Sequence, residues 1–208
     1  MTTTKGRFFT FEGIDGCGKS TQLSRVADTL QTMGRDILVT REPGGPPISE
    51  KIREILISPD NKQMHPETEC LLYLAARAQH VKEVIKPAMD KGQIVLCDRF
   101  EQATFAYQGY GRSLDMPFLK EINKFASGGI VPDITFIFDI PVELSQQRLS
   151  VIGKGKDRME SEGAQFFEKV RTGYLEAARA APEKIRLLDG GKGMDELTEE
   201  VLRVITSF

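Results

Sequence analysis

Short runs of hydrophobic residues alternate with longer amphipathic segments along the chain. Five such runs predict β-strands, over residues 8–12, 36–40, 93–97, 134–138 and 184–188. Between Lys19 and Met33 the hydrophobic residues recur at helical spacing, which predicts a helix that ends at Gly34. Strands that alternate with helices are typical of a parallel sheet covered on both faces. We therefore expect an α/β, doubly wound fold with a five-stranded parallel sheet flanked by helices.

Further helices are indicated in the second half of the pattern. Residues 66–86 predict two helices, and residues 196–205 predict the last one. Asp115 is a typical helix N-cap, with Pro117 in the first turn that follows it. Residues 43–47 read Pro-Gly-Gly-Pro-Pro and predict a turn. We find no repeat and no linker, so we expect a single domain over residues 1–208.

Charge and composition narrow the classes of function. The chain has 208 residues, with 28 Lys and Arg against 30 Asp and Glu, for a net charge of −2. This balance argues against nucleic acid and against a membrane as partners. Three cysteines without a pairing pattern, and no hydrophobic run of about 20 residues, predict a soluble cytoplasmic protein with reduced thiols. The composition does not argue against a local cluster of arginines that binds a small anionic ligand.

The clearest motif lies between the first predicted strand and the first helix. It matches the phosphate-loop pattern GxxxxGK[ST] and consists of Gly13, Ile14, Asp15, Gly16, Cys17, Gly18, Lys19 and Ser20. In such a loop, backbone N–H groups and the helix N-terminus bind phosphate oxygens. We expect Lys19 to contact the β and γ phosphates of ATP, Ser20 to bind Mg²⁺ and Thr21 to contact the α phosphate. The motif predicts a P-loop NTPase-type fold that binds a nucleoside triphosphate.

Three kinds of protein commonly carry this loop: nucleotide switches, motors and small-molecule kinases. A guanine-specific switch needs an NKxD-type motif, and the sequence has none. A motor usually needs a longer chain or modules for assembly. The remaining choice is a kinase, whose phosphoryl acceptor the rest of the sequence must indicate.

Arginines follow two of the predicted strands. Arg41 follows the second strand, and Asp98 and Arg99 follow the third. Ligands of an open parallel sheet bind at the carboxyl ends of its strands, so these side chains face the crevice of the phosphate loop. Guanidinium groups bind phosphate in a bidentate manner, which favours an anionic acceptor, and Asp98 is placed to hold Mg²⁺ through water. We expect the cations to gather at this crevice and the acidic excess to be spread over the helices elsewhere.

A set of motifs in this order resembles a known family. The motifs are FEGIDGCGKST, TREPGG, LLYLAARAQH, DRF, AYQG and DRME. Together they resemble the thymidylate kinases of the bacterial type, and the similarity spans nearly the entire chain. The resemblance implies transfer of the γ-phosphoryl group of ATP to dTMP, giving dTDP and ADP, with Mg²⁺ as cofactor and a homodimer as the assembly.

The resemblance also implies roles for individual residues. Arg41 and Arg99 would hold the acceptor phosphate of dTMP, and Asp15 would contact the 3′-hydroxyl of its sugar. The thymine and the sugar would be bound by Tyr73, Arg77, Thr104, Tyr107 and Gln108. For Tyr73, plain core packing is the alternative to stacking on the base.

A glycine- and lysine-rich segment, residues 151–161, lies between two predicted helices. It is either a solvated surface loop or a lid that brings positive charge over the phosphates. On the second interpretation Arg148, Lys154, Lys156 and Arg158 supply the charge that the phosphate loop lacks. We expect Arg158 to stabilise the transition state, with Lys19, Asp15 and Arg99 as the other catalytic residues. Cys17 lies at a helix N-terminus, which predicts a lowered thiol pKa.

Two other functions fit the same motifs. One is a neighbouring activity, a deoxynucleoside kinase or another nucleoside monophosphate kinase. The other is a nucleotide-dependent regulator that has lost turnover. A nucleoside kinase accepts a hydroxyl and has less use for both Arg41 and Arg99. Retention of Lys19, Asp15, Asp98 and a basic lid argues against a regulator.

Overall fold

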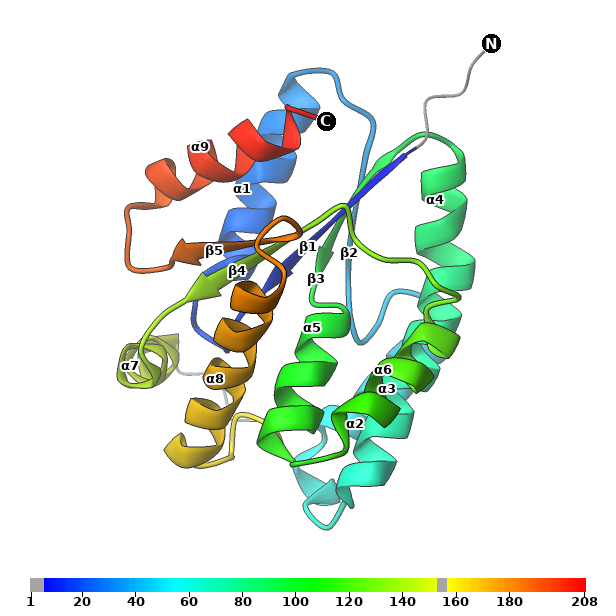
Figure 1. Cartoon of the computed structure of the whole chain (residues 1–208), viewed down its shortest axis with the longest axis vertical. Coiled ribbons are helices and arrows are strands. Elements are labelled where there is room, and N and C mark those ends of the chain that lie inside the picture. The colour runs from blue at the N-terminus through cyan, green and yellow to red at the C-terminus, as the bar shows by residue number, and fades with distance from the viewer. Residues whose placement is uncertain (1–5, 153–156) are drawn as a thin grey trace.

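The computed structural model describes residues 6–152 and 157–208, and its centre is a parallel sheet (Figure 1). The strands are β1 (Arg7–Glu12), β2 (Ile37–Arg41), β3 (Ile94–Asp98), β4 (Ile134–Asp139) and β5 (Ile185–Asp189). They pair in the order β2-β3-β1-β4-β5, and all four pairings are parallel. The five-stranded parallel sheet expected from the hydrophobic runs is confirmed, with each strand shifted by at most one residue.

Helices connect the strands. They are α1 (Lys19–Thr32), α2 (Pro47–Ile57), α3 (Pro66–His80), α4 (Lys86–Asp90), α5 (Glu101–Thr104), α6 (Met116–Ala126), α7 (Val142–Ile152), α8 (Ala164–Ala180) and α9 (Met194–Ile205). A short 3₁₀ turn, Pro59–Asn61, follows α2. Residues 66–86, predicted as two helices, are helical throughout: α3 continues without a break into the π-helical segment Val81–Ile85, and α4 begins only at Lys86. A second π-helical segment, Phe105–Gly111, extends α5.

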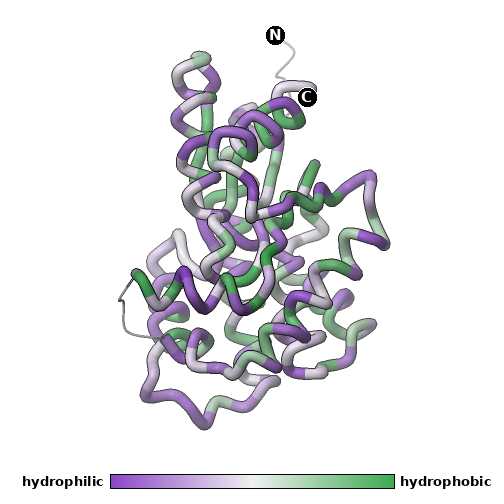
Figure 2. Tube along the Cα trace, turned by 90° about the vertical axis from the view of Figure 1, so that its left-hand side faces the viewer, coloured by the Kyte–Doolittle hydropathy of each residue, from purple (hydrophilic) through white to green (hydrophobic). Residues whose placement is uncertain are grey.

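Both faces of the sheet are covered, as a doubly wound fold requires. Every residue of β1 after Arg7 is buried, and successive side chains of a strand point to opposite faces. Phe9 and Phe11 pack with α1, α8 and α9 in the main core, whereas Phe8 packs with α4 in a second cluster. Figure 1 shows α1 and α9 side by side against the sheet. Figure 2 shows hydrophobic and hydrophilic positions alternating along the outer helices.

The carboxyl ends of the central strands place the chemistry of the chain together. β1 leads into the phosphate loop, β3 ends at Asp98, and β2 ends at Arg41 just before a cis Glu42–Pro43 peptide bond. β1 and β3 are neighbours in the sheet, and the chain leaves β1 toward β2 but leaves β3 toward β4, in the opposite direction. Such a reversal point, at the carboxyl ends of the strands, is where folds of this kind bind ligands.

Two general expectations concern the thiols and the membrane. Cys17, Cys70 and Cys97 are all free and buried. None of the helices in the described residues is long and hydrophobic enough to span a bilayer.

Candidate active site

The phosphate loop curls between β1 and α1. Gly16 and Gly18 take left-handed backbone angles, with φ of 77° and 94°, which side chains with a Cβ rarely adopt. The loop borders a depression that is also lined by Ser20, Thr21, Arg148 and Lys192. This arrangement turns backbone N–H groups and a helix N-terminus toward one open space, as a site for phosphates requires.

Charged side chains are packed tightly behind this loop. The Nζ of Lys19 lies 3.6 Å from Oδ1 of Asp15 and 4.0 Å from Oδ1 of Asp98. Burial and the nearby Arg99 oppose the charge on Lys19, but Asp98 and Asp15 raise its pKa above the usual value. Burial also opposes ionisation of Asp15, but Arg99 and Lys19 outweigh it and hold the pKa of Asp15 well below its usual range. Both groups are therefore charged at neutral pH.

A hydroxyl and a carboxylate meet where the loop passes β3. The hydroxyl of Ser20 donates to Oδ2 of Asp98. Mg²⁺ in nucleotide sites takes only one or two protein oxygens and completes its shell with phosphates and water. The Ser20–Asp98 pair fits that donor set, and residues 6–152 and 157–208 contain no larger cluster of His, Cys, Asp or Glu placed to hold a metal.

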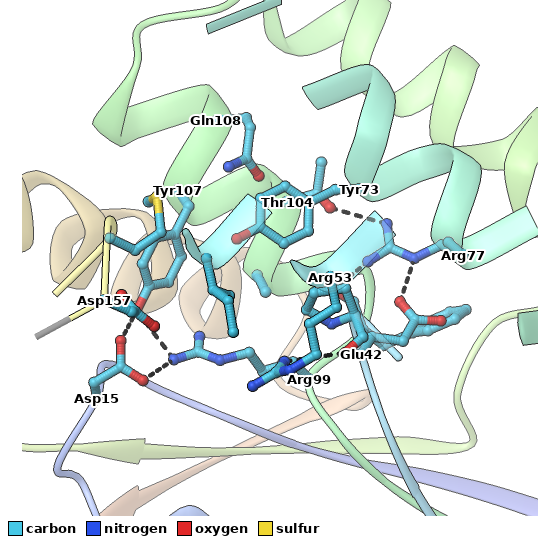
Figure 3. A pocket seen from close by; sticks show the side chains of 15 residues that line it. Asp15, Glu42, Arg53, Tyr73, Arg77, Arg99, Thr104, Tyr107, Gln108 and Asp157 are labelled. Carbon is cyan, nitrogen blue, oxygen red and sulfur yellow. Dashed lines mark hydrogen bonds and ion pairs between the residues drawn. The ribbon is translucent and has the colours of Figure 1, made fainter. Parts of the chain in front are cut away.

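A second pocket opens on the other side of Asp15 (Figure 3). Its lining includes seven of the eight side chains predicted for the base, sugar and acceptor phosphate. They come from the phosphate loop, from α3, from the residue just after β3, and from α5 with the π-helical segment that extends it. The pocket is lined by Asp15, Glu42, Pro43, Arg53, Ile57, Tyr73, Arg77, Arg99, Phe100, Ala103, Thr104, Tyr107, Gln108, Asp157 and Met159. Tyr73 is half-buried and forms part of this wall, so it is not a plain core residue.

Arg77 is held rigidly at the bottom of the pocket. Its Nε donates to Glu42 at 2.7 Å, and its Nη1 donates to Thr104 at 2.9 Å and to Asn123 at 2.6 Å. Its Nη2 donates to the carbonyl of Phe100 at 2.8 Å. Of the five N–H groups of the guanidinium, one is left without a partner among the described residues. Arg77 thus offers the pocket a single fixed donor.

Arg99 connects the second pocket to the phosphate loop. It has a left-handed backbone, with φ of 70°, which is uncommon for a residue with a side chain. Its Nη2 donates to Asp15 at 2.6 Å and to the hydroxyl of Tyr107 at 3.1 Å, and its Nη1 donates to Tyr174 at 3.2 Å. Tyr107 in turn donates to Asp15 at 3.2 Å. The phosphate loop and the second pocket are therefore tied together at Asp15.

Arg53 is a lining residue that sequence reasoning missed. It lies on α2, a helix that the expected turn over residues 43–47 concealed, and its Nη1 donates to the carbonyl of Pro43 at 3.0 Å. Arg41, predicted for this position, lines neither pocket, because its guanidinium pairs with Glu50 at 2.9 Å on the surface. The hydrophobic pattern of residues 47–57 could have indicated the helix α2, and with it the position of Arg53.

The predicted lid is described only at its two ends. Lys154 and Lys156 lie outside the described residues. Asp157 and Met159 line the second pocket, whereas Arg158 is buried and donates to Glu69 at 2.6 Å and to the carbonyl of Leu56 at 2.8 Å. Arg158 lines neither pocket, and its role at the transferring phosphoryl group stays a prediction.

Arg148 does lie beside the phosphate loop. Its Nη1 donates to the carbonyls of Gly16, at 3.3 Å, and Cys17, at 3.5 Å, and its Nη2 donates to that of Gly190 at 3.2 Å. Its position on α7 thus brings one cation of the predicted set to the outer rim of the triphosphate depression.

Two expectations about charge need correction. Burial raises the pKa of the Cys17 thiol, although Lys19 pulls it down, so the lowered pKa expected from the helix N-terminus is wrong. The acidic groups are also not confined to the outer helices. Asp15 and Glu69 are ion-paired with Arg99 and Arg158, two of the arginines that were expected to gather at the crevice.

Comparisons with known proteins agree with this geometry. The family model of thymidylate kinase matches residues 11–201. The chain is 47% identical to a thymidylate kinase of Syntrophotalea carbinolica, over 93% of this chain and 92% of that protein. It is 44% identical to one of Pelotomaculum thermopropionicum, over 96% and 92%, and 46% identical to one of Ectopseudomonas mendocina, over 98% and 96%.

Proposed function

The chain belongs to the thymidylate kinase family, and on that premise we propose how its two pockets divide the substrates. The activity is the phosphorylation of dTMP to dTDP with ATP, and the resemblance found in the motifs is confirmed. The position of the Asp15 carboxylate is the main support for assigning one substrate to each pocket. The carboxylate accepts from Arg99 on one side and lies 3.6 Å from Lys19 on the other, so the two pockets meet there.

The depression along the phosphate loop binds ATP. Lys19 contacts the β and γ phosphates, and the loop from Gly13 to Thr21 surrounds them with N–H groups. Arg148 lies at the outer rim of this depression, where it stays close to the carbonyls of the loop. Its positive charge favours the approach of the triphosphate from that side.

The second pocket binds dTMP. Tyr73, Arg77, Thr104 and Gln108 surround the base, and Tyr107 lies beside the sugar, where it leaves little room for a ribose 2′-hydroxyl. Thr104 accepts from Arg77, so its own hydroxyl proton is free to donate to the base. The aromatic face of Tyr73 contributes stacking.

Arg99 and Arg53 hold the acceptor phosphate. Among the arginines that line the second pocket, Arg77 pairs with Glu42 and Arg99 pairs with Asp15. Arg53 has no carboxylate partner among the described residues, and its one hydrogen bond goes to a carbonyl. Arg53 therefore contributes uncompensated positive charge, which is what a phosphate dianion requires.

The reaction is in-line transfer, and the protein mainly aligns and neutralises. An oxygen of the dTMP phosphate attacks the γ phosphorus, and ADP leaves. Lys19 neutralises the donor phosphates while Arg99 and Arg53 hold the attacking phosphate, which offsets the repulsion between two anions. Asp15 contacts the 3′-hydroxyl of the sugar and fixes Arg99 and Lys19 relative to each other.

The Ser20 hydroxyl and, through water, Asp98 would hold Mg²⁺ on the triphosphate. The ion would supply charge neutralisation at the β and γ phosphates.

We propose a cytoplasmic homodimer as the assembly and location. Hydrophobic side chains remain exposed on α3 and α6, namely Leu71, Phe118 and Phe125, the last 88% exposed. Burying them against a second copy would remove them from water. Light scattering coupled to size-exclusion chromatography should give twice the mass of one chain. The Phe125→Asp variant should give a lower mass.

A coupled ADP-release assay tests the function. We expect dTMP to be the best acceptor among dTMP, dUMP, UMP, CMP and thymidine. UMP should be slow because Tyr107 crowds its 2′-hydroxyl. A higher rate with thymidine than with dTMP would indicate a nucleoside kinase, and no turnover of any acceptor would indicate a regulator.

A further inference from the structure

A fully buried carboxylate, Glu69, lies beneath the base pocket and takes no part in the steps above. Its side chain has no exposure to solvent, and four donor contacts reach it. Oε1 accepts from Nε2 of Gln108 at 2.8 Å and from Nε of Arg112 at 3.2 Å. Oε2 accepts from Nη2 of Arg112 at 3.0 Å and from Nη1 of Arg158 at 2.6 Å. Glu69 thus joins α3, the π-helical segment and the segment that ends the predicted lid.

The arginines keep this carboxylate ionised. Burial opposes its charge, but the hydrogen bonds from Arg112 and Gln108 hold the pKa of Glu69 below its usual value. An ionised carboxylate can only accept hydrogen bonds. The end of the Gln108 amide that faces Glu69 must therefore be the NH₂ group, and the opposite end must be the carbonyl oxygen.

The orientation of Gln108 decides what the pocket presents to a base. Its Oε1 has no donor among the described residues, and the residue lines the pocket near Tyr73 (Figure 3). The pocket therefore presents an acceptor from Gln108 and a fixed donor from Arg77. An amide turned the other way would present two donors instead.

This donor and acceptor pair complements the imide edge of thymine. Thymine carries an N3–H donor beside carbonyl acceptors, so its N3–H matches Oε1 of Gln108 and a carbonyl matches the N–H of Arg77. Cytosine carries a lone pair at N3 and an amino group at C4. With cytosine in the same place, acceptor would face acceptor and donor would face donor, which strongly disfavours binding.

We propose that Glu69 is a specificity-determining positioning residue: it locks the Gln108 amide so that the pocket accepts from the N3–H of a thymine-type base and rejects cytosine. Arg112 and Arg158 serve this lock by keeping Glu69 charged and in place. The proposal rests on the function above, in which the base of dTMP occupies this pocket. It also assigns Arg158 a place in the lock rather than at the phosphates.

The test compares kcat/KM for dTMP and dCMP in Glu69→Gln and the wild type. A glutamine at position 69 can accept or donate, so the Gln108 amide is no longer held one way. We expect the ratio of kcat/KM for dTMP to that for dCMP to fall by roughly 10-fold, the usual worth of one lost hydrogen bond to a buried group. The KM for ATP should stay within about twofold because the phosphate loop is untouched.

Three further variants make the result specific. Glu162→Gln is the matched control: Glu162 pairs with the same Arg112 at 2.7 Å, with no bond to Gln108, so the ratio should not change. In a Gln108→Ala background, Glu69→Gln should have no further effect on the ratio, because the residue acts through Gln108. Should Glu69→Gln fold poorly, Glu69→Asp keeps the charge, shortens the reach to Gln108 and should lower the ratio as well.

The outcomes distinguish a failure of the proposed function from a failure of the role of Glu69. A wild type that does not prefer dTMP over dCMP contradicts the proposed function. A wild type that prefers dTMP, with a ratio unchanged in Glu69→Gln and Glu69→Asp, overturns the role of Glu69. Equal losses for dTMP, dCMP and ATP would also overturn it, because they would show that Glu69 only supports the fold.

Discussion

Glu12 is a fully buried carboxyl group at the end of β1, directly before the phosphate loop. Its Oε1 accepts from the backbone N–H of Phe100 at 2.7 Å, and its Oε2 accepts from the hydroxyl of Tyr174 at 3.0 Å. Burial raises the pKa of Glu12 from 4.5 to about 7, although Arg99, these hydrogen bonds and Arg77 all lower it. Replacing Glu12 by the neutral glutamine should therefore change how stability depends on pH.

The sign follows from proton binding. Between pH 4.5 and about 7 the folded protein keeps a proton on Glu12 that the unfolded chain has lost. The stability from this proton is fully present below pH 4.5 and is lost as the pH rises through 7. A pKa raised this far corresponds to about 3 kcal/mol in the free energy of unfolding. Glu12→Gln has no proton to lose in this range and should lack this dependence.

Urea unfolding of both proteins at pH 5, 6, 7 and 8 measures the effect. Between pH 5 and pH 8 the free energy of unfolding of the wild type should fall by about 2 to 3 kcal/mol more than that of Glu12→Gln. The contributions of the other titrating groups cancel when the two proteins are compared at each pH. Glu199→Gln, at an exposed position of α9, is the control and should show no such trend. A difference between wild type and Glu12→Gln that stays constant within about 1 kcal/mol would refute the reasoning.

Three further predictions concern arginines and a thiol. Arg53→Ala should raise the KM for dTMP by roughly 10-fold or more, because a charged hydrogen bond to the acceptor phosphate is lost. Arg41→Ala should change this KM less than about twofold. Steady-state kinetics that rank the two variants the other way would contradict the placement of the acceptor phosphate. Cys17 should react with iodoacetamide slowly in the native protein and rapidly in urea, since its thiol is buried with a raised pKa, and mass spectrometry showing fast native labelling would contradict this. Arg158→Ala should lower the free energy of unfolding by about 3 kcal/mol, because Glu69 stays buried with one partner fewer. A loss of roughly 10²-fold in kcat with unchanged stability would instead indicate that Arg158 contacts the transferring phosphoryl group.

The sheet could be predicted closely from the hydrophobic runs. Strands of a sheet covered on both faces are continuous hydrophobic runs, and β1 and β4 are buried along nearly their whole length. The prediction missed α2, because Pro46 and Pro47 suggest a turn. In the structure Pro47 occupies the first position of the helix, where a missing N–H costs nothing. The π-helical segments carry no comparable signal in the sequence.

The candidate site was predictable in unequal parts. The phosphate loop follows from its own spacing between a strand and a helix. Tyr73 and Gln108 were named through the resemblance alone, because they come from separate helices and only the packing of α3 against the π-helical segment brings them together. Arg53 and Glu69 were missed, since the sequence shows a charge but not which side chain will be its partner.

The pairing of charges explains how a chain of net charge −2 binds two anionic nucleotides. Arg77 and Arg99 each have their own carboxylate, so their guanidinium groups are held in one orientation before a substrate arrives. Such preorganisation removes the cost of ordering long side chains when the substrate binds. A phosphate bound as proposed would share Arg99 with Asp15, which would weaken the attraction to unrelated anions. In the proposed division of substrates, Arg53, with no carboxylate partner among the described residues, would supply the attraction, and the paired arginines would supply the alignment.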